Sequence, residues 1–413
     1  MRLDKGDIVT RRPLEGTVVL DLSRVLAGPW ATQTLADLGA RVIKIEHPVR
    51  GDDTRHWGPP WQSKDDKSES AYFLSANRGK ESVALDLKDP RGQSIVRKLV
   101  KRADIMIENF RVGGLASYGL DYESMLKINP AIVYCSISGF GQTGPYADKP
   151  GYDFIVQAMS GLMSITGDTH PIKTGVAVSD LFAGLYATIG ILAAYAQAKA
   201  TGKGDHIDIS LLEAQLATLA NQSLNYLVSE ESPRLSGNAH PNIVPYQVFE
   251  TADHAIVIAV GNDRQFEALC RVIGSPELSA DTRFMTNPAR VRNRDVLVPL
   301  IAHAISERDA AFWLEALDQG GIPAGPVNTI GAAFADRQVV ERGVVERLHR
   351  ADLGPVPTVR SPLRFRNSDV MSDRPPPALG DSTFSVLTEA GLSRSEISAL
   401  IAAGVAVGES DET

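Results

Sequence analysis

The fold is decided near the start of the chain by Thr17–Leu22 (TVVLDL) and Arg41–Glu46 (RVIKIE), two apolar runs of strand length. Between them, Trp30–Leu38 carries apolar residues at helical spacing. A strand, a helix and a second strand in this order predict a βαβ unit with parallel strands. Gly28-Pro29 stands where the helix should begin, and proline is favoured at a first helical position because its missing N–H would have no partner there. We therefore expect the backbone N–H groups of that turn to be free to meet an anion.

The same alternation of strand and helix continues along the next hundred residues. It predicts an α/β fold in which a mostly parallel sheet carries helices on both faces, a Rossmann-like large domain. The further strands are expected at Ser82–Leu87, Ile105–Glu108 and Ala131–Ile137, and the helices at Asp89–Lys101 and Tyr122–Ile128.

The chain of 413 residues is too long for one core, because single cores stop growing near about 250–300 residues. A helical pattern over Leu211–Leu227 gives way to the turn-rich Ser229–Pro245, which predicts a domain boundary. A smaller α+β unit follows, with a strand at 255–260 and helices at 265–273, 294–305 and 310–317, and Gly320–Pro326 is expected to be a connector. The predicted domains are a large one formed by 1–225 with 330–413 and a small one formed by 226–329.

Composition and charge exclude several classes of function. With 42 Lys and Arg against 50 Asp and Glu the net charge is −8, so no basic field is available to bind nucleic acid. The two cysteines, Cys135 and Cys270, lie far apart, which argues against a disulfide framework or a zinc site. The first residues show neither a secretory nor a transit peptide, and the cytoplasm is the default compartment. The apolar run Leu181–Gln197 is shorter than the ~20 residues that span a bilayer, so we expect a buried core helix and no membrane association.

Gly139–Gly144 (GFGQTG) spells a glycine pattern resembling a dinucleotide fingerprint directly after an expected strand. Pro145 and Pro150 follow at once, so no helix is expected to open at the third glycine. We therefore expect no nicotinamide cofactor, and interpret the glycines as a turn beside a ligand. The chain also contains no P-loop, HExxH or GxSxG pattern.

Asp180 lies between a strand-like run and the long apolar helix, within Thr174–Gly184 (TGVAVSDLFAG). From its position alone, the simpler interpretation is a helix N-cap, since aspartate accepts hydrogen bonds from first-turn N–H groups. A second role is compatible with the first: first-turn N–H groups and the helix dipole would keep the carboxylate ionised, and an ionised, positioned carboxylate is a nucleophile toward an activated acyl group.

The chain resembles the class III CoA-transferases, the family of formyl-CoA transferase and carnitine CoA-transferase. The resemblance covers nearly the whole chain in order. It is carried by 19–29 (VLDLSRVLAGP), 37–46 (DLGARVIKIE), 77–80 (NRGK), 85–88 (LDLK), 108–110 (ENF), 151–153 (GYD) and 321–326 (GIPAGP). It implies an interlocked homodimer of ring-like chains, each with a large Rossmann-like domain built from both ends of the chain. It also places the family's catalytic aspartate at Asp180, which would pass through an aspartyl anhydride and an aspartyl-CoA thioester.

The resemblance further implies a coenzyme A site, with acyl-CoA as substrate and no metal. The implied CoA contacts are Leu26, Ala27, His47, the segment from Leu85 to Lys88, Asn109, Phe110, Arg111, Gly151, Tyr152 and Asp153.

The substrate is expected to be a short dicarboxylic acid. Formyl-CoA transferase has a glutamine where this chain has Leu26, a basic residue where it has Glu81, and a glycine-rich lid without counterpart here. The chain is more similar to the succinate–hydroxymethylglutarate branch, through 51–55 (GDDTR), 57–60 (WGPP), 244–246 (VPY), 261–262 (GN) with 265–266 (QF), 290–291 (RV) with 293–294 (NR), and 374–377 (RPPP). That likeness implies succinyl-CoA as donor and glutarate or hydroxymethylglutarate as acceptor. The far carboxylate needs a cation, for which Arg55 and Arg78 are candidates, with Arg290 and His240 behind them.

Three alternatives stay open at this point. An α-methylacyl-CoA racemase of the same fold has Gly-His-Asp where this chain has Gly151-Tyr152-Asp153, and tyrosine, with an ordinary pKa near ~10, is a poor base for removing a Cα proton. Formate, oxalate or carnitine could be the acyl acceptor instead. A CoA-binding protein without catalysis, in which Asp180 is only a cap, is the third.

Overall fold

The computed structural model describes residues 12–408. The chain divides into two compact units. The first holds the chain up to Ser160, residues 174–223 and the chain from Glu341 onward; the second holds 161–173 and 224–340.

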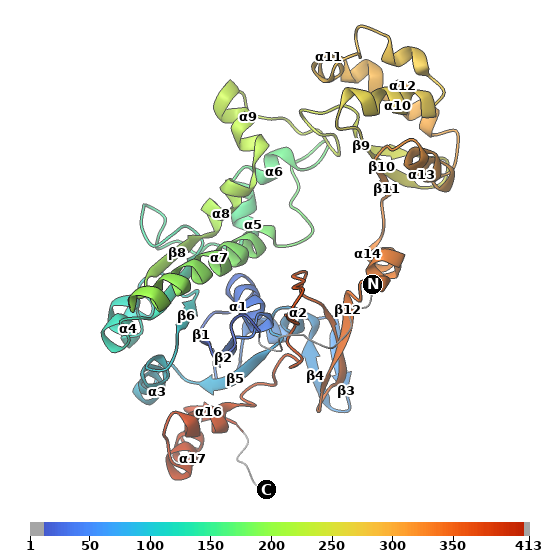
Figure 1. Cartoon of the computed structure of the whole chain (residues 1–413). Helices are drawn as coiled ribbons and strands as arrows, with labels where there is room; N and C mark the ends of the chain where they lie inside the picture. The colour runs from blue at the N-terminus through green and yellow to red at the C-terminus, as the bar shows by residue number, and fades with distance from the viewer. Residues whose placement is uncertain (1–11, 409–413) are drawn as a thin grey trace. The chain divides into compact units, whose positions relative to one another are not determined.

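A mostly parallel seven-stranded sheet forms the centre of the first unit, in the order β14-β5-β2-β1-β6-β7-β8 (Figure 1). All neighbouring strands pair in parallel except β14, which runs antiparallel to β5. The expected α/β class with a mostly parallel sheet is confirmed, and both ends of the chain contribute strands to it. The strands are β1 (Val18–Asp21), β2 (Arg41–Glu46), β5 (Lys80–Leu85), β6 (Ile105–Glu108), β7 (Val133–Ser138), β8 (His206–Ser210) and β14 (Ala406–Val407).

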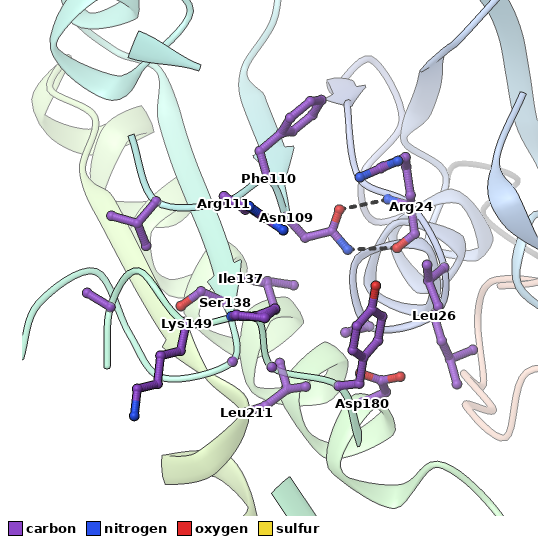
Figure 2. A pocket seen from close by; sticks show the side chains of 18 of the residues that line it. Arg24, Leu26, Asn109, Phe110, Arg111, Ile137, Ser138, Lys149, Asp180 and Leu211 are labelled. Carbon is purple, nitrogen blue, oxygen red and sulfur yellow. Dashed lines mark hydrogen bonds between the residues drawn. The ribbon is translucent and has the colours of Figure 1, made fainter. Parts of the chain in front are cut away.

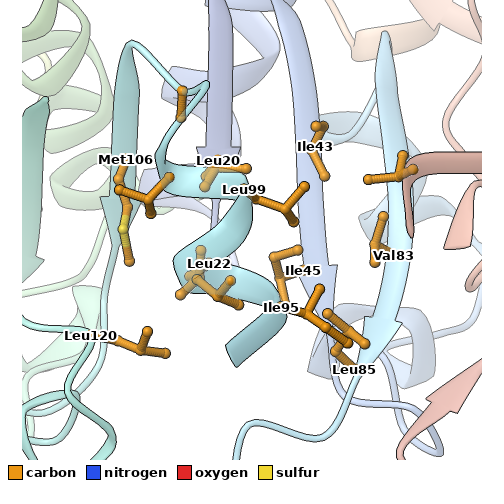
Figure 3. Packing of buried hydrophobic residues seen from close by; sticks show 14 of the residues in the cluster. Leu20, Leu22, Ile43, Ile45, Val83, Leu85, Ile95, Leu99, Met106 and Leu120 are labelled. Carbon is orange, nitrogen blue, oxygen red and sulfur yellow. The ribbon is translucent and has the colours of Figure 1, made fainter. Parts of the chain in front are cut away.

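Helices pack on both faces of this sheet, and they bury its strands on both sides. On one face, Ile95 and Leu99 of α3 lie against Ile43, Ile45 and Leu85 of the sheet (Figure 3). On the other face, α1 and α7 form a second apolar cluster with β1, β6 and β7. The helices of the two faces are α3 (Pro90–Val100), α4 (Tyr122–Ile128), α16 (Thr383–Glu389) and α17 (Arg394–Ala402) on the first, and α1 (Ala27–Asp37), α7 (Val178–Thr201) and α8 (Leu211–Thr218) on the second.

The second unit has its own core around a small antiparallel sheet of order β11-β10-β9. Phe266, Leu297, Trp313 and other apolar side chains of three helices pack on it. The strands are β9 (Tyr246–Glu250), β10 (Ala255–Ala259) and β11 (Ala324–Pro326), and the packed helices are α10 (Asp263–Val272), α12 (Arg294–Ile305) and α13 (Ala310–Gln319). The remaining helices are α2 (Ala71–Ala76), α5 (Asp153–Met159), α6 (Leu162–Ile165), α9 (Asn221–Ser229), α11 (Asn287–Arg292), α14 (Ile330–Ala335) and α15 (Arg337–Glu341), and two hairpins comprise β3 (Trp61–Lys64) with β4 (Lys67–Ser70) and β12 (Val345–Arg350) with β13 (Gly354–Val359).

Three expectations about local structure were wrong. The helical pattern over 211–227 is two helices, α8 and α9, because Ala220 adopts a left-handed φ of 48° between them. The connector at 320–326 ends in β11, which pairs with β10 although it contains Gly and Pro, because strand pairing uses main-chain atoms. Pro29 is the third residue of α1 rather than the first.

The long helix α7 is only partly buried, which corrects the expected core helix. Ala183, Ala187 and Ile191 are fully buried, whereas Leu185 and Ile189 are exposed. By length and composition alone α7 could cross a membrane, and a core helix passes the same test. One face of α7 packs on the sheet and on α1, and the other is apolar and uncovered.

Candidate functional site

A cavity of about 200 Å³ lies at the carboxyl ends of the parallel strands, where ligands bind in open α/β sheets (Figure 2). Its wall comes from the loop after β1, the loop after β6, the turn after β7 and the first turn of α7. The lining residues are Arg24–Ala27, Asp53, Asn109–Val112, Ile137–Gly139, Ala147–Tyr152, Asp180 and Leu211.

Asp180 is the third residue of α7 and faces this cavity, but it does not cap the helix. The cap is provided from elsewhere: the Ser179 N–H donates to Asp153 Oδ1 at 2.8 Å. Asp153 also accepts from the Gln157 side chain at 2.8 Å, which fixes its carboxylate. Because Asp153 satisfies the helix end, the Asp180 carboxylate is left available to a ligand.

The Asp180 carboxyl is held close to its protonation midpoint at neutral pH. Burial, with the nearby Asp153 carboxylate, raises the pKa of Asp180 to about 7. No hydrogen bond or ion pair to the Asp180 carboxylate occurs within residues 12–408 to offset this. The expectation that helix N–H groups keep Asp180 ionised is therefore wrong, because none within residues 12–408 donates to its carboxylate, while desolvation and the like charge of Asp153 raise its pKa.

A close helix contact brings Asp180 to the start of α1. A Cβ on Gly184, one turn beyond Asp180 on α7, would lie 2.6 Å from the Ala27 carbonyl oxygen, so only glycine permits this approach. Leu26 and Ala27 line the same cavity, and the first N–H groups of a helix have no partner within it. The turn before them is strained, because Val25 has a φ of 71°, which is rare for a β-branched residue. The α1–α7 contact therefore brings Asp180 and the start of α1 to the same cavity.

Asn109 joins the loop after β6 to the loop after β1. Its Oδ1 accepts from the Arg24 N–H at 2.8 Å, and its Nδ2 donates to the Arg24 carbonyl at 2.7 Å (Figure 2). The Arg24 guanidinium lies over the Phe110 ring at 5.6 Å. These contacts hold two walls of the cavity together.

A second cavity of about 190 Å³ lies on the other side of Arg24 and Phe110, which line both cavities with Asp53. Most residues expected to contact CoA meet at these two cavities, and Asp153 lies behind the first one as the cap of α7. The first cavity holds Leu26, Ala27, Asn109, Phe110, Arg111, Gly151 and Tyr152, and the second holds His47, Leu85, Lys88 and Phe110.

None of the four cations expected to bind a distal carboxylate lines the first cavity. Arg55 is buried, with bonds of 2.8 Å to Glu46 and 2.6 Å to Glu69. Arg78 is buried and forks onto Asp37. A guanidinium already paired with carboxylates in the core is not free for a second one.

The other two candidates lie in the second unit. Arg290 is fully buried there, where it donates to the Val244 carbonyl at 2.7 Å and to Asp263 at 2.7 Å. His240 stands on a loop of the same unit, against the Tyr246 ring. The cations that do line the first cavity are Arg24, Arg111 and Lys149, none of which is singled out by a sequence motif for a distal carboxylate.

Tyr72 is a neighbour of Asp180 that the sequence did not indicate. It lies on the short helix α2, and burial together with the Asp180 and Asp153 carboxylates raises the pKa of Tyr72 to about 12. Its phenol therefore stays protonated, as a hydrogen-bond donor. No spacing links it to Asp180, more than a hundred positions away.

Across residues 12–408, no group of three or more His, Cys, Asp or Glu side chains is arranged to hold a metal ion. The glycine turn after β7 contributes Ser138 and Gly139 to the cavity, and the next helix, α5, begins only at Asp153. The chemistry that this arrangement offers is that of a carboxylate beside main-chain N–H donors and surface cations.

Known proteins share both the sequence and this architecture. The sequence model described as CoA-transferase family III matches residues 14–383. The chain is 50% identical to the succinate–glutarate CoA-transferase of Agrobacterium fabrum, over 93% of this chain and 97% of that one, and 42% identical to the acetyl-CoA:oxalate CoA-transferase of Acetobacter aceti, over 88% and 92%. The crystal structure of a CAIB/BAIF family protein from Brucella suis is similar with a TM-score of 0.82 and 46% identity, covering 92% of this chain and all of that one.

Proposed function

The chain belongs to CoA-transferase family III, and from that premise we propose that it transfers coenzyme A from succinyl-CoA to glutarate. The observation that carries the proposal is the unpaired Asp180 carboxylate at the cavity beside the start of α1. The likeness to the Agrobacterium fabrum succinate–glutarate enzyme supports the choice of substrates.

The proposed reaction begins with attack of an ionised Asp180 oxygen on the succinyl-CoA carbonyl. The C–S bond breaks, CoA leaves as thiolate, and a mixed succinyl–aspartyl anhydride forms. The thiolate then attacks the aspartyl carbonyl, which releases succinate and gives an aspartyl-CoA thioester. Thioester is exchanged for anhydride and back, so no step consumes a further energy source.

The second half of the reaction repeats these steps with the acceptor. A glutarate carboxylate attacks the aspartyl-CoA carbonyl and displaces the thiolate, forming a glutaryl–aspartyl anhydride. The thiolate attacks the glutaryl carbonyl, which yields glutaryl-CoA and returns Asp180 as a carboxylate. The first N–H groups of α1, beside Leu26 and Ala27, would donate to the oxyanion of each tetrahedral intermediate.

We propose that the far carboxylate of the acid meets one of the three cations that line the cavity, Arg24, Arg111 or Lys149. Arg24 is paired with Asp53 at 3.1 Å near the surface, a contact weak enough to exchange for a substrate carboxylate.

We also propose that the predicted division into a domain of 1–225 with 330–413 and one of 226–329 describes two separately folding parts.

We further propose that two copies of the chain assemble. The exposed apolar side chains of α7, Leu185, Tyr186 and Ile189, are a surface that a second copy would cover. Light scattering during size-exclusion chromatography measures the mass of the assembly, and Ile189→Glu should shift a dimer toward monomer.

The test of the function is to mix the protein with succinyl-CoA and a panel of acids, glutarate, hydroxymethylglutarate, oxalate, formate and carnitine, and to follow new thioesters by mass spectrometry. Glutaryl-CoA formed by the wild type and not by Asp180→Ala supports the proposal. A different acid at the head of the ranking changes the acceptor. No new thioester from any acid, with deuterium entering Cα of a branched acyl-CoA, would move the assignment to a racemase.

A further inference from the structure

A third hollow in the first unit, about 250 Å³, adjoins the first cavity, with which it shares Arg111 and Val112. Its polar wall includes Glu108, the last residue of β6, Ser136 within the neighbouring strand β7, and His206, the first residue of β8. The proposed transfer reaction uses none of these three side chains, although the loop that follows Glu108 carries Asn109, Phe110 and Arg111.

The three side chains form one hydrogen-bonded row. Glu108 and Ser136 are direct partners across the β6–β7 ladder and hydrogen-bond to each other. Ser136 Oγ lies 2.9 Å from His206 Nε2, and the His206 ring stacks on Tyr122 at 4.8 Å. Glu108 and Ser136 are buried, whereas His206 is only partly covered, so the row runs from the core to the hollow.

Glu108 also acts on the loop beyond it. Its Oε2 accepts the Phe110 N–H at 2.7 Å, which closes a tight turn over Asn109. Asn109 in turn holds the Arg24 main chain at both its N–H and its carbonyl, and Phe110 lies beneath the Arg24 guanidinium. A single acceptor on Glu108 thus fixes the two residues that connect the walls of both cavities.

We propose that Glu108 is a positioning residue of the coenzyme site, which holds the Asn109–Arg111 loop in its binding shape through the Phe110 N–H and exchanges its proton along Ser136 and His206. The inference rests on the proposed function, because it takes the two cavities to bind CoA. The hydroxyl of Ser136 is the link: it donates to Glu108 when that carboxylate is ionised and can instead donate to His206 when Glu108 carries a proton.

The electrostatics around Glu108 make this proton exchange relevant near neutral pH. Burial, with a contribution from Asp208 on β8, raises the pKa of Glu108 to about 7, against the hydrogen bonds from Ser136 and Phe110. Burial also lowers the pKa of His206. Two other ionisable side chains near the row lie on β7: burial raises the pKa of the Tyr134 phenol and of the Cys135 thiol, so both stay protonated. The remaining ionisable side chains around the hollow are Arg111, Asp121, Tyr122 and Glu123.

The sign of the effect follows from the acceptor. An ionised Glu108 accepts the Phe110 N–H strongly, whereas a protonated carboxyl is a weaker acceptor, so the loop loosens as the pH falls through about 7. If only the ionised form binds well, CoA affinity should fall about tenfold between about pH 8 and about pH 6.

The experiment measures CoA affinity by calorimetry across this pH range in an Asp180→Asn background, which removes the other carboxyl titrating there. Glu108→Gln keeps an oxygen acceptor for the Phe110 N–H but cannot titrate. As an uncharged acceptor it should bind CoA more weakly than the background protein does at about pH 8, and its affinity should be nearly the same at about pH 6, where the affinity of the background protein has fallen about tenfold. Because the ligand is the same, the titration of the CoA phosphate cancels in the comparison.

Ser136→Ala sharpens the test, because it removes a hydrogen bond that favours the ionised Glu108. Its loss of affinity should begin at higher pH than that of the background protein, a shift that a purely structural role would not produce. Parallel pH curves for Glu108→Gln and the background protein would overturn the inference alone. Absence of CoA binding by the folded background protein would overturn the proposed function and the inference together.

Discussion

Two carboxylates of the first unit, Asp21, which is fully buried, and Asp180, which is partly buried, behave in opposite ways. Asp21 is fully buried at the end of β1, where it accepts from Thr32 Oγ1 at 2.6 Å and from Lys80 Nζ at 3.0 Å. Although burial opposes its ionisation, Lys80 and Lys44 with the hydroxyl donors lower the pKa of Asp21 to about 2. Asp180 has no such partner, and its pKa is raised to about 7. Burial alone therefore does not decide the charge of a carboxylate; its partners do.

The comparison separates a structural region from a reactive one. Asp21, paired with Lys80, is one of several buried ion pairs of the first unit, together with Lys44–Asp52, Arg55–Glu46 and Arg78–Asp37. Its charges are neutralised in place, so they are unavailable to a substrate. The carboxylate of Asp180 is left unneutralised, and an unpaired charge is free to react.

The largest expected effect is the loss of transfer when the unpaired carboxylate is removed. Asp180→Ala should lower glutaryl-CoA formation by about 10³-fold or more, because no other side chain takes over the covalent step. Mass spectrometry of the thioesters measures this, and circular dichroism controls for folding. Retention of a tenth of wild-type activity would mean that Asp180 is not the nucleophile.

Stability should respond with opposite signs at the two carboxylates. Asp21→Asn leaves the Lys80 ammonium without its charge partner and should destabilise the fold by about 3–5 kcal/mol. Asp180→Asn removes a carboxylate whose ionisation opposes folding, and should stabilise by about 1–3 kcal/mol. Urea unfolding near pH 8 measures both, and Arg283→Ala, at an exposed ion pair, should change little.

The pH dependence of these effects follows from the direction of each shift. The folded pKa of Asp180 lies above its unfolded value, so its cost is absent below about pH 4, grows up to about pH 7, and stays constant above. The folded pKa of Asp21 lies below its unfolded value, so its contribution is present above about pH 4 and is lost as the pH falls through about 2. Equal signs for the two variants would contradict the comparison.

Much of the fold was accessible from the sequence, because its strands are continuous apolar runs. β2 and β6 have the predicted bounds, because each is a short run of buried residues that ends at a turn or loop on both sides. The αL residue at Ala220 was not accessible, as an alanine gives no turn signal. The family resemblance identified Asp180, but the nearby like charge of Asp153, which accepts from the Ser179 N–H, arises from two helix starts that only the folded chain brings together. For the same reason Arg55 was expected at the substrate, and its partners Glu46 and Glu69 stayed hidden.

A smaller effect should follow from moving the reactive carboxylate without changing it. Gly184→Ala places a methyl group against the Ala27 carbonyl, so α7 must shift, and transfer should fall by about 10- to 100-fold. Gly331→Ala on α14 is the matched control: its Cβ meets only Thr329 Oγ1 at 4.0 Å, and activity should be unchanged. Wild-type turnover by Gly184→Ala would show that the helix contact does not position Asp180.

The smallest effect concerns the like charge beside Asp180. Asp153→Asn keeps an oxygen acceptor for the Ser179 N–H but removes a negative charge, so the pKa of Asp180 should fall toward its ordinary value. The acid limb of the transfer rate at saturating substrate should move to lower pH, with a gain of about threefold near pH 6. A limb that stays in place would assign it to another group.

The central claim is that Asp180 becomes covalently bound to CoA, and trapping tests it most directly. The protein is mixed with succinyl-CoA without an acceptor acid, quenched, and its intact mass and peptides are measured. The account predicts a mass gain equal to CoA less one water, mapped to the peptide containing Asp180 and absent from Asp180→Asn. An adduct on another residue, or glutaryl-CoA formation by protein that never carries the adduct, would contradict it.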